Sequence, residues 1–180
     1  MVFYDFYYTG FRAKLQETLL INRKNRAILN AEYDRKENGE KNMTVLIMDG
    51  QGGNIGRQLV KSVCERFSDL EVIAVGSNSI ATANMLKGGS VSVATGENAA
   101  CVAARRADVI IGPLGIVVAD ALLGEITPKM AAAVGQSGAV RILIPMNKCD
   151  SLVAGVQNLS TAALLEDAMQ KLETVISARA

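Results

Sequence analysis

The chain has 180 residues, of which 49% are hydrophobic and 21% are charged, and its formal net charge is +1. This length supports one domain with a substantial core, and so small a net charge gives no reason to expect nucleic acid or an anionic membrane as a partner. The sequence contains no histidine, which excludes Ser-His and Cys-His dyads and most catalytic zinc sites.

Residues 1–42 differ in composition from the rest of the chain. They hold all four tyrosines and three of the four phenylalanines, and they end in a polar run over residues 34–42. We expect an N-terminal extension outside the folded domain, flexible or partly helical, with Met43 as the natural start. The alternative is an amphipathic arm, because Phe11, Leu15 and Leu19 fall at helical spacing.

From Met43 onward, short apolar runs alternate with longer amphipathic stretches. Several of these runs are continuous rather than alternating, which is typical of strands covered on both faces of a parallel sheet. We expect strands at about residues 44–49, 71–75, 91–94, 108–111 and 140–145.

Helical signals occupy the stretches between the expected strands. After a glycine-rich turn, Ile55, Leu59 and Val63 repeat every four residues, which places one apolar stripe on a helix. Further helices are expected over about residues 79–87, 98–107, 128–134 and 160–178, with Gly135 as the C′ glycine of the helix over 128–134. The alternation predicts one α/β domain over residues 43–180, a three-layer, doubly wound, mainly parallel Rossmann-like sheet.

Small and polar residues follow each of the five expected strands. Ligands of open parallel sheets bind outside the carboxyl ends of the strands, so these residues are candidates for ligand contact. Beyond the first turn, the candidates are Ser77, Asn78, Glu97, Asn98, Gly112 and Asn147.

The most specific motif is the turn after the first strand. Its residues are Gly50, Gln51, Gly52, Gly53, Asn54, Ile55 and Gly56. The turn fits G-x-x-G-x-x-G and G-x-G-x-x-x-G, two variants of the dinucleotide turn. Glycines let the backbone approach a pyrophosphate, and the amides that begin the following helix face the anion. The alternative is that these glycines serve tight strand–helix packing alone.

The second strand lacks the acid that a typical NAD site places at its end. Ser77 and Asn78 stand there instead; they can bind a ribose or a 2′-phosphate, or can cap the next helix. The pattern disfavours NAD and favours NADP or another phosphorylated nucleotide. It also disfavours a methyltransferase, although residues 49–52 resemble the glycine motif of S-adenosylmethionine methyltransferases. The sequence has no P-loop motif and no tyrosine after Met43 for a Tyr/Lys proton donor.

Few side chains are candidates for a second chemical role, so the catalytic residues stay unassigned. Glu97 either stands at the start of a helix because the helix dipole favours an acid there, or contacts a ligand or acts as a base. Glu125 is explained as a solvated loop acid, and Asp120 as a paired or cleft-lining group. Lys148 either neutralises a phosphate or is a surface lysine, and Cys149 has no activating histidine.

Five segments together resemble one known family. They read DGQGGNIGRQL from Asp49, ATGENA from Ala94, ADVIIGP from Ala107, LGEITP from Leu123 and ILIPMN from Ile142. These are similar to the small bacterial proteins of the domain of unknown function 3842, which occur mainly in clostridia-like Gram-positive bacteria. The resemblance covers about residues 43–171. It implies a Rossmann-like nucleotide-binding domain that begins near Met43, and it implies no activity.

Two functions remain open for this domain. The first is an enzyme that binds a nucleotide phosphate on the turn, with an NADP-type oxidoreductase as the favoured class; the second is a non-catalytic nucleotide sensor or regulatory subunit. A packing role for the glycines alone would instead indicate a structural or assembly protein.

Location and partners can also be predicted from the sequence. The odd, scattered cysteines (Cys64, Cys101 and Cys149) predict free thiols in a reducing cytoplasm. We expect a small-molecule nucleotide as ligand, no nucleic acid and no membrane. The apolar stretch 116–123 is either core or the face of a homo-oligomer.

Overall fold

The computed structural model describes residues 42–146, 153–156 and 159–179. Almost all of the expected N-terminal extension therefore lies outside the described residues. Three candidates from the sequence, Asn147, Lys148 and Cys149, also lie outside them.

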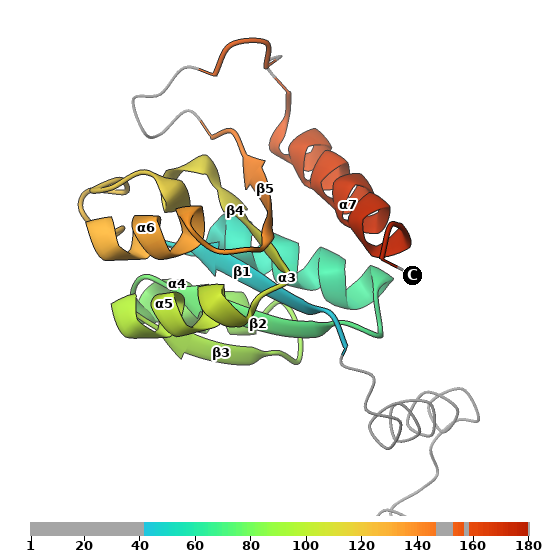
Figure 1. The fold of residues 1–180 in the computed structure, drawn as a ribbon, viewed down its shortest axis with the longest axis horizontal. Helices are drawn as coiled ribbons and strands as arrows, with labels where there is room; N and C mark the ends of the chain where they lie inside the picture. The colour runs from blue at the N-terminus through green and yellow to red at the C-terminus, as the bar shows by residue number, and fades with distance from the viewer. Residues whose placement is uncertain (1–41, 147–152, 157–158, 180) are drawn as a thin grey trace, which may run out of the picture. The chain divides into compact units, whose positions relative to one another are not determined.

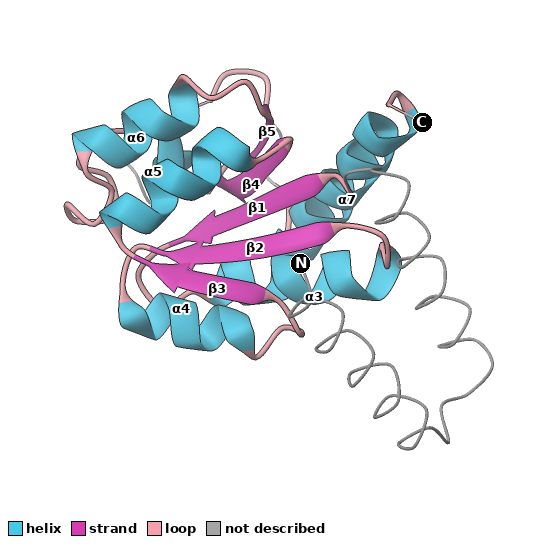
Figure 2. Ribbon diagram, turned by 60° about the horizontal axis from the view of Figure 1, so that its bottom comes forward, coloured by secondary structure: helices cyan, strands magenta, loops and turns pink. Residues whose placement is uncertain are grey.

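Five parallel strands form one sheet in the order β3-β2-β1-β4-β5 (Figures 1 and 2). The strands are β1 (Thr44–Asp49), β2 (Glu71–Gly76), β3 (Ser92–Thr95), β4 (Val109–Pro113) and β5 (Val140–Ile144). Asp49 pairs with Gly76, and Gly76 pairs with Thr95. The carboxyl ends of β1, β2 and β3 are therefore aligned at one edge of the sheet.

Helices alternate with these strands along the chain. They are α3 (Asn54–Arg66), α4 (Ser79–Leu86), α5 (Glu97–Arg106), the 3₁₀ helix η1 (Leu114–Val117), α6 (Pro128–Gly135) and α7 (Thr161–Ser177). The prediction of Gly135 as a C′ glycine is wrong, because Gly135 is the last residue of α6 and Gln136 caps the helix in a right-handed conformation.

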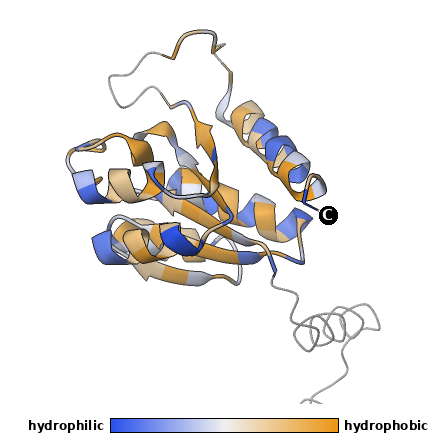
Figure 3. Cartoon of the chain, viewed as in Figure 1, coloured by the Kyte–Doolittle hydropathy of each residue, from blue (hydrophilic) through white to orange (hydrophobic). Residues whose placement is uncertain are grey.

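Two apolar cores cover the two faces of the sheet, and the alternating residues of β1 divide between them. Val45 and Ile47 pack with α3, α4 and α7, whereas Leu46 and Met48 pack with α5, α6 and η1. Figure 3 shows the hydrophobic strands enclosed between the helices. Every residue of β1 is buried, as expected for a central strand covered on both faces. The predicted doubly wound α/β fold is confirmed.

The helices begin in two different ways, and the difference positions the site. Asn78, Thr127 and Ser160 cap α4, α6 and α7 by accepting a hydrogen bond from the amide three residues on. In contrast, the N-cap residues of α3 and α5 are Gly53 and Gly96, which offer no capping side chain. The first amides of α3 must therefore find partners elsewhere.

Candidate functional site

The glycine-rich turn lies where the order of the sheet reverses. From β1 the chain builds β2 and β3 on one side, and then β4 and β5 on the other. In doubly wound sheets the ligand crevice forms at this reversal, outside the carboxyl ends of the strands. The turn between β1 and α3 is thus at the position where this fold binds ligands.

Two neighbouring glycines of the turn serve different purposes. Gly53 has a φ of +65°, and a Cβ added there would come within 2.6 Å of the carbonyl oxygen of Ala81 in α4. Gly52 has no such constraint, because the nearest atom to its added Cβ is Nδ2 of Asn54 at 3.7 Å. Packing therefore requires glycine at Gly53, whereas an added Cβ at Gly52 would make only an ordinary van der Waals contact with the side chain of Asn54.

The remaining glycines of the turn are also closely packed. A Cβ added to Gly56 would lie 2.8 Å from Cβ of Asp49, and one added to Gly50 would lie 2.7 Å from Oγ of Ser77. The packing explanation that the sequence left open thus accounts for Gly50, Gly53 and Gly56. It does not account for Gly52.

The carboxylate of Asp49 holds the beginning of α3. Its Oδ1 accepts a hydrogen bond from the amide of Gly50 at 2.8 Å, and its Oδ2 accepts one from the amide of Gly56 at 2.7 Å. Burial raises the pKa of Asp49, and the hydrogen bonds from these amides oppose that rise. The expectation of a row of bare amides facing an anion is therefore met only in part, since a protein carboxylate already occupies the deeper ones.

A second carboxylate, that of Glu125, lies at the carboxyl ends of β1 and β2. Its Oε2 accepts hydrogen bonds from the amide of Gln51 at 2.8 Å, from Oγ of Ser77 at 2.5 Å and from Nδ2 of Asn78 at 2.8 Å. Partial burial alone would raise the pKa of Glu125, but these three donors together lower it. Glu125 is therefore not the solvated loop acid that the sequence suggested.

Two amides of the turn remain without a partner. Within the described part of the chain, the main-chain N–H groups of Gly52 and Asn54 donate no hydrogen bond. Asn84 of α4 braces the same turn, because its Nδ2 donates to the carbonyl oxygen of Gly52 at 2.7 Å and to Oδ1 of Asn54 at 3.0 Å. Gly52 and Asn54 are exposed, so their amides can meet a ligand.

Ser77 and Asn78 lie beside the turn, as the sequence predicted. Asn78 does more than one thing there: its Oδ1 caps α4 by accepting from Ala81, and its Nδ2 reaches the carbonyl oxygen of Gln51 at 3.1 Å. The capping role that the sequence left open is therefore present together with a position at the candidate site.

The other candidates have separate surroundings. Glu97 joins the start of α5 to α6, since its Oε2 accepts from the hydroxyl of Thr127 at 2.8 Å and its Oε1 lies 3.1 Å from Nζ of Lys129. The hydrogen bonds from Thr127 and Lys129 lower its pKa. Asn98 is exposed on α5. Gly112 is buried where β4 meets β1, and its added Cβ would lie 2.3 Å from the carbonyl oxygen of Met48.

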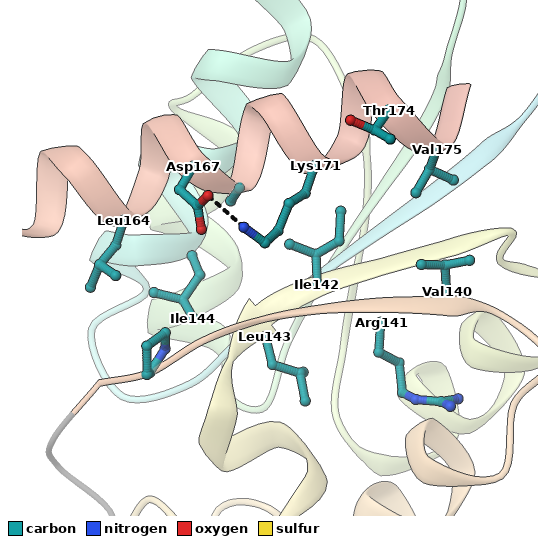
Figure 4. A pocket seen from close by; sticks show the side chains of 12 residues that line it. Val140, Arg141, Ile142, Leu143, Ile144, Leu164, Asp167, Lys171, Thr174 and Val175 are labelled. Carbon is teal, nitrogen blue, oxygen red and sulfur yellow. Dashed lines mark hydrogen bonds and ion pairs between the residues drawn. The ribbon is translucent and has the colours of Figure 1, made fainter. Parts of the chain in front are cut away.

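A hollow of about 550 Å³ lies away from these residues, between β5 and α7 (Figure 4). Its wall is mainly aliphatic, and the polar groups on α7 include Asp167 and Lys171, which pair with each other at 2.5 Å. It shares no residue with the glycine-rich turn.

Two further kinds of site were sought in the described ranges. No group of three or more His, Cys, Asp or Glu residues is placed there to hold a metal ion. No helix there has the length and apolar character needed to cross a membrane.

Glu125 is the site residue that sequence reasoning placed least well. It is 74 residues from Gln51 in the sequence, and no local sequence pattern predicts the hydrogen bond between them. The segment that carries it is unusual, because Asp120, Leu122 and Leu123 have positive φ values of 61°, 57° and 61°. Leucine seldom adopts this conformation, so the path of the segment could not be read from its residues.

Comparisons with known proteins give a family and distant structural likenesses. None of the curated proteins compared matches the sequence. A solved structure, the dodecameric FMN-dependent UbiX-like decarboxylase of Escherichia coli O157:H7, is 17% identical, with coverage of 74% of this chain and 75% of that chain and a TM-score of 0.38. So low a score says nothing about a ligand or an assembly of this chain. The family model of the Domain of unknown function (DUF3842) matches residues 44–177, and the chain belongs to that family.

Proposed function

We propose that this domain binds a phosphate-bearing nucleotide at the carboxyl ends of β1 and β2. The single observation that carries the proposal is the pair of exposed, unpartnered amides of Gly52 and Asn54, at the sheet reversal where doubly wound folds bind ligands. Amides at a helix start are suitable donors for phosphate oxygens. Gly52 has no Cβ to obstruct an approaching phosphate, and only the side chain of Asn54 lies within 4 Å of where a Cβ would be.

The two carboxylates define which part of the turn is available. Asp49 occupies the amides of Gly50 and Gly56, and Glu125 occupies that of Gln51. A phosphate therefore contacts the outer part of the turn, at Gly52 and Asn54, rather than the whole first turn of α3. This arrangement favours a single phosphate contact and a moderate affinity.

The contacts of the acids support binding without turnover, as in a nucleotide sensor or regulatory subunit. An NADP-type oxidoreductase needs a proton donor or acceptor beside the ligand. Asp49 already holds α3, and Glu97 already joins α5 to α6. These acids serve the fold, so we favour the sensor over the oxidoreductase.

The test is nucleotide titration of the full chain and of a variant at Gly52. We expect NAD, ADP or ATP to raise the melting temperature, since a ligand at a hundredfold excess over its Kd adds about 2.7 kcal/mol of stability. Gly52→Val places a branched side chain beside the free amides and should weaken binding at least tenfold, with little change in the stability of the free protein.

Gly138→Val is the matched control, because an added Cβ at Gly138 likewise meets no close contact, with no atom within 4 Å, but Gly138 lies before β5. This variant should bind like the wild type. Equal binding by wild type and Gly52→Val would place the ligand elsewhere, and no response to any nucleotide would refute the proposed function.

A further inference from the structure

The acid that β2 lacks in its own sequence is supplied in space by Glu125. Oγ of Ser77 and Nδ2 of Asn78, directly after β2, donate to Oε2 of Glu125. Glu125 is 48 residues from Ser77 along the chain, on the segment between η1 and α6. An acid at the end of the second strand is the group that accepts ribose hydroxyls in dinucleotide-binding sheets.

The two oxygens of this carboxylate are used differently. Oε2 accepts three hydrogen bonds, so its acceptor capacity is filled. Oε1 accepts none from the described residues, and no buried side-chain oxygen among them lacks a partner, so Oε1 must be reached by solvent. The carboxylate is thus held in place through Oε2, and Oε1 is available to accept a hydrogen bond from a ligand.

The anchoring donors also fix the orientation of the carboxylate. One comes from the glycine-rich turn (Gln51) and two come from the end of β2 (Ser77 and Asn78). A free acceptor held beside the turn lies close to the amides proposed for the phosphate. A nucleoside phosphate carries both kinds of partner, a phosphate that accepts and ribose hydroxyls that donate.

We propose that Oε1 of Glu125 accepts a hydrogen bond from a ribose hydroxyl, so that the site selects nucleotides with an unmodified 2′-hydroxyl and rejects 2′-phosphorylated ones. This inference rests on the proposed function and names its ligand class. A 2′-phosphate is mostly a dianion at neutral pH, so it donates a hydrogen bond poorly and would bring its negative charge against the carboxylate. The proposal thus favours NAD, whereas the sequence favoured NADP.

The test compares ligands that differ at one position of the ribose. Calorimetric titration of the wild-type chain should show NAD binding at least tenfold more tightly than NADP, and ADP binding at least fivefold more tightly than 2′-deoxy-ADP. Glu125→Gln should reduce both preferences to about twofold or less, because a neutral amide neither repels a phosphate nor accepts as strongly from a hydroxyl.

Glu166→Gln is the control variant, since Glu166 is an exposed acid of α7 that pairs with Arg66. It should keep both preferences. The melting temperatures of the free variants verify that each is folded, and the two wild-type comparisons need no variant at all.

Several outcomes would overturn the inference. Equal binding of NAD and NADP by the wild type would do so, as would preferences that survive in Glu125→Gln. Tighter binding of all nucleotides by Glu125→Gln would show that the carboxylate blocks the site instead of contacting the ribose. In each of these cases nucleotides still bind, so the proposed function stands; if no nucleotide binds the wild type, the proposed function fails as well.

Discussion

Gly53→Ala tests the claim that packing, rather than a ligand, requires this glycine. Alanine would have to adopt the φ of +65° found at Gly53, which costs about 1–2 kcal/mol for a residue with a Cβ. Its methyl carbon would also lie 2.6 Å from the carbonyl oxygen and 2.7 Å from Cα of Ala81. Because these are main-chain atoms of a helix, the overlap cannot be relieved by a side-chain rotation, and we assign it about 1–3 kcal/mol.

The opposing effect is smaller. Alanine reduces the conformational entropy of the unfolded chain and thereby stabilises the folded state by about 0.4–1 kcal/mol. The net expected loss in the free energy of unfolding is therefore about 1–5 kcal/mol, which is a substantial part of the total of about 5–15 kcal/mol for a typical domain.

The assay is urea unfolding followed by far-ultraviolet circular dichroism, with Gly52→Ala as the control one residue away. No atom lies closer than 3.7 Å to the added Cβ at Gly52, so this control should stay within about 0.5 kcal/mol of wild type. If Gly53→Ala were as stable as Gly52→Ala, the packing argument would be refuted. The result also decides which variants can probe binding, because a change at Gly53 alters the fold itself.

Three further changes have defined expectations. Leu123→Asn should stabilise the domain by about 0.5–1 kcal/mol in urea unfolding, since Leu123 is 96% exposed at a φ of 61° that asparagine tolerates better; a loss of stability would show that this leucine makes a necessary contact. Thr127→Ala should cost about 1–2 kcal/mol in the same assay, because the hydroxyl accepts from the amide of Met130 at the start of α6, and an unchanged midpoint would contradict that role. Glu125→Gln should weaken the dependence of the free energy of unfolding on pH, because the hydrogen bonds lower the folded pKa of Glu125 from its ordinary 4.5. The stability that the wild type gains over this variant is complete above pH 4.5 and is lost as pH falls through the folded pKa. An advantage that grows on acidification would contradict the assignment.

The sheet and helices could be predicted because local patterns decide them. The continuous apolar run Val45–Met48 specifies a strand buried on both faces, and the spacing of Ile55, Leu59 and Val63 specifies one stripe of α3. Helices were expected to begin at about residues 128 and 160, and Thr127 and Ser160 cap the helices that begin there. Each of these features depends on neighbours within a few residues.

The hydrogen bonding of the candidate site depends on contacts that the sequence does not encode locally. The position of the glycine-rich turn was predictable, but not that Asp49 turns back onto the amide of Gly56. Nor could the pattern show that Glu125 arrives from a distant segment, since three residues of that segment adopt a left-handed backbone without being glycine. The sequence therefore predicted the glycine-rich turn between β1 and α3, but not the two carboxylates that hydrogen-bond to it.

The most direct measurement is an amide NMR titration of the full-length chain with NAD. We predict that the amide resonances of Gly52 and Asn54 move most, with smaller shifts at Ser77 and Asn78 beside the Glu125 carboxylate. Shifts confined to the hollow between β5 and α7, or no shift at Gly52 and Asn54 when NAD is in excess, would contradict nucleotide binding at this turn.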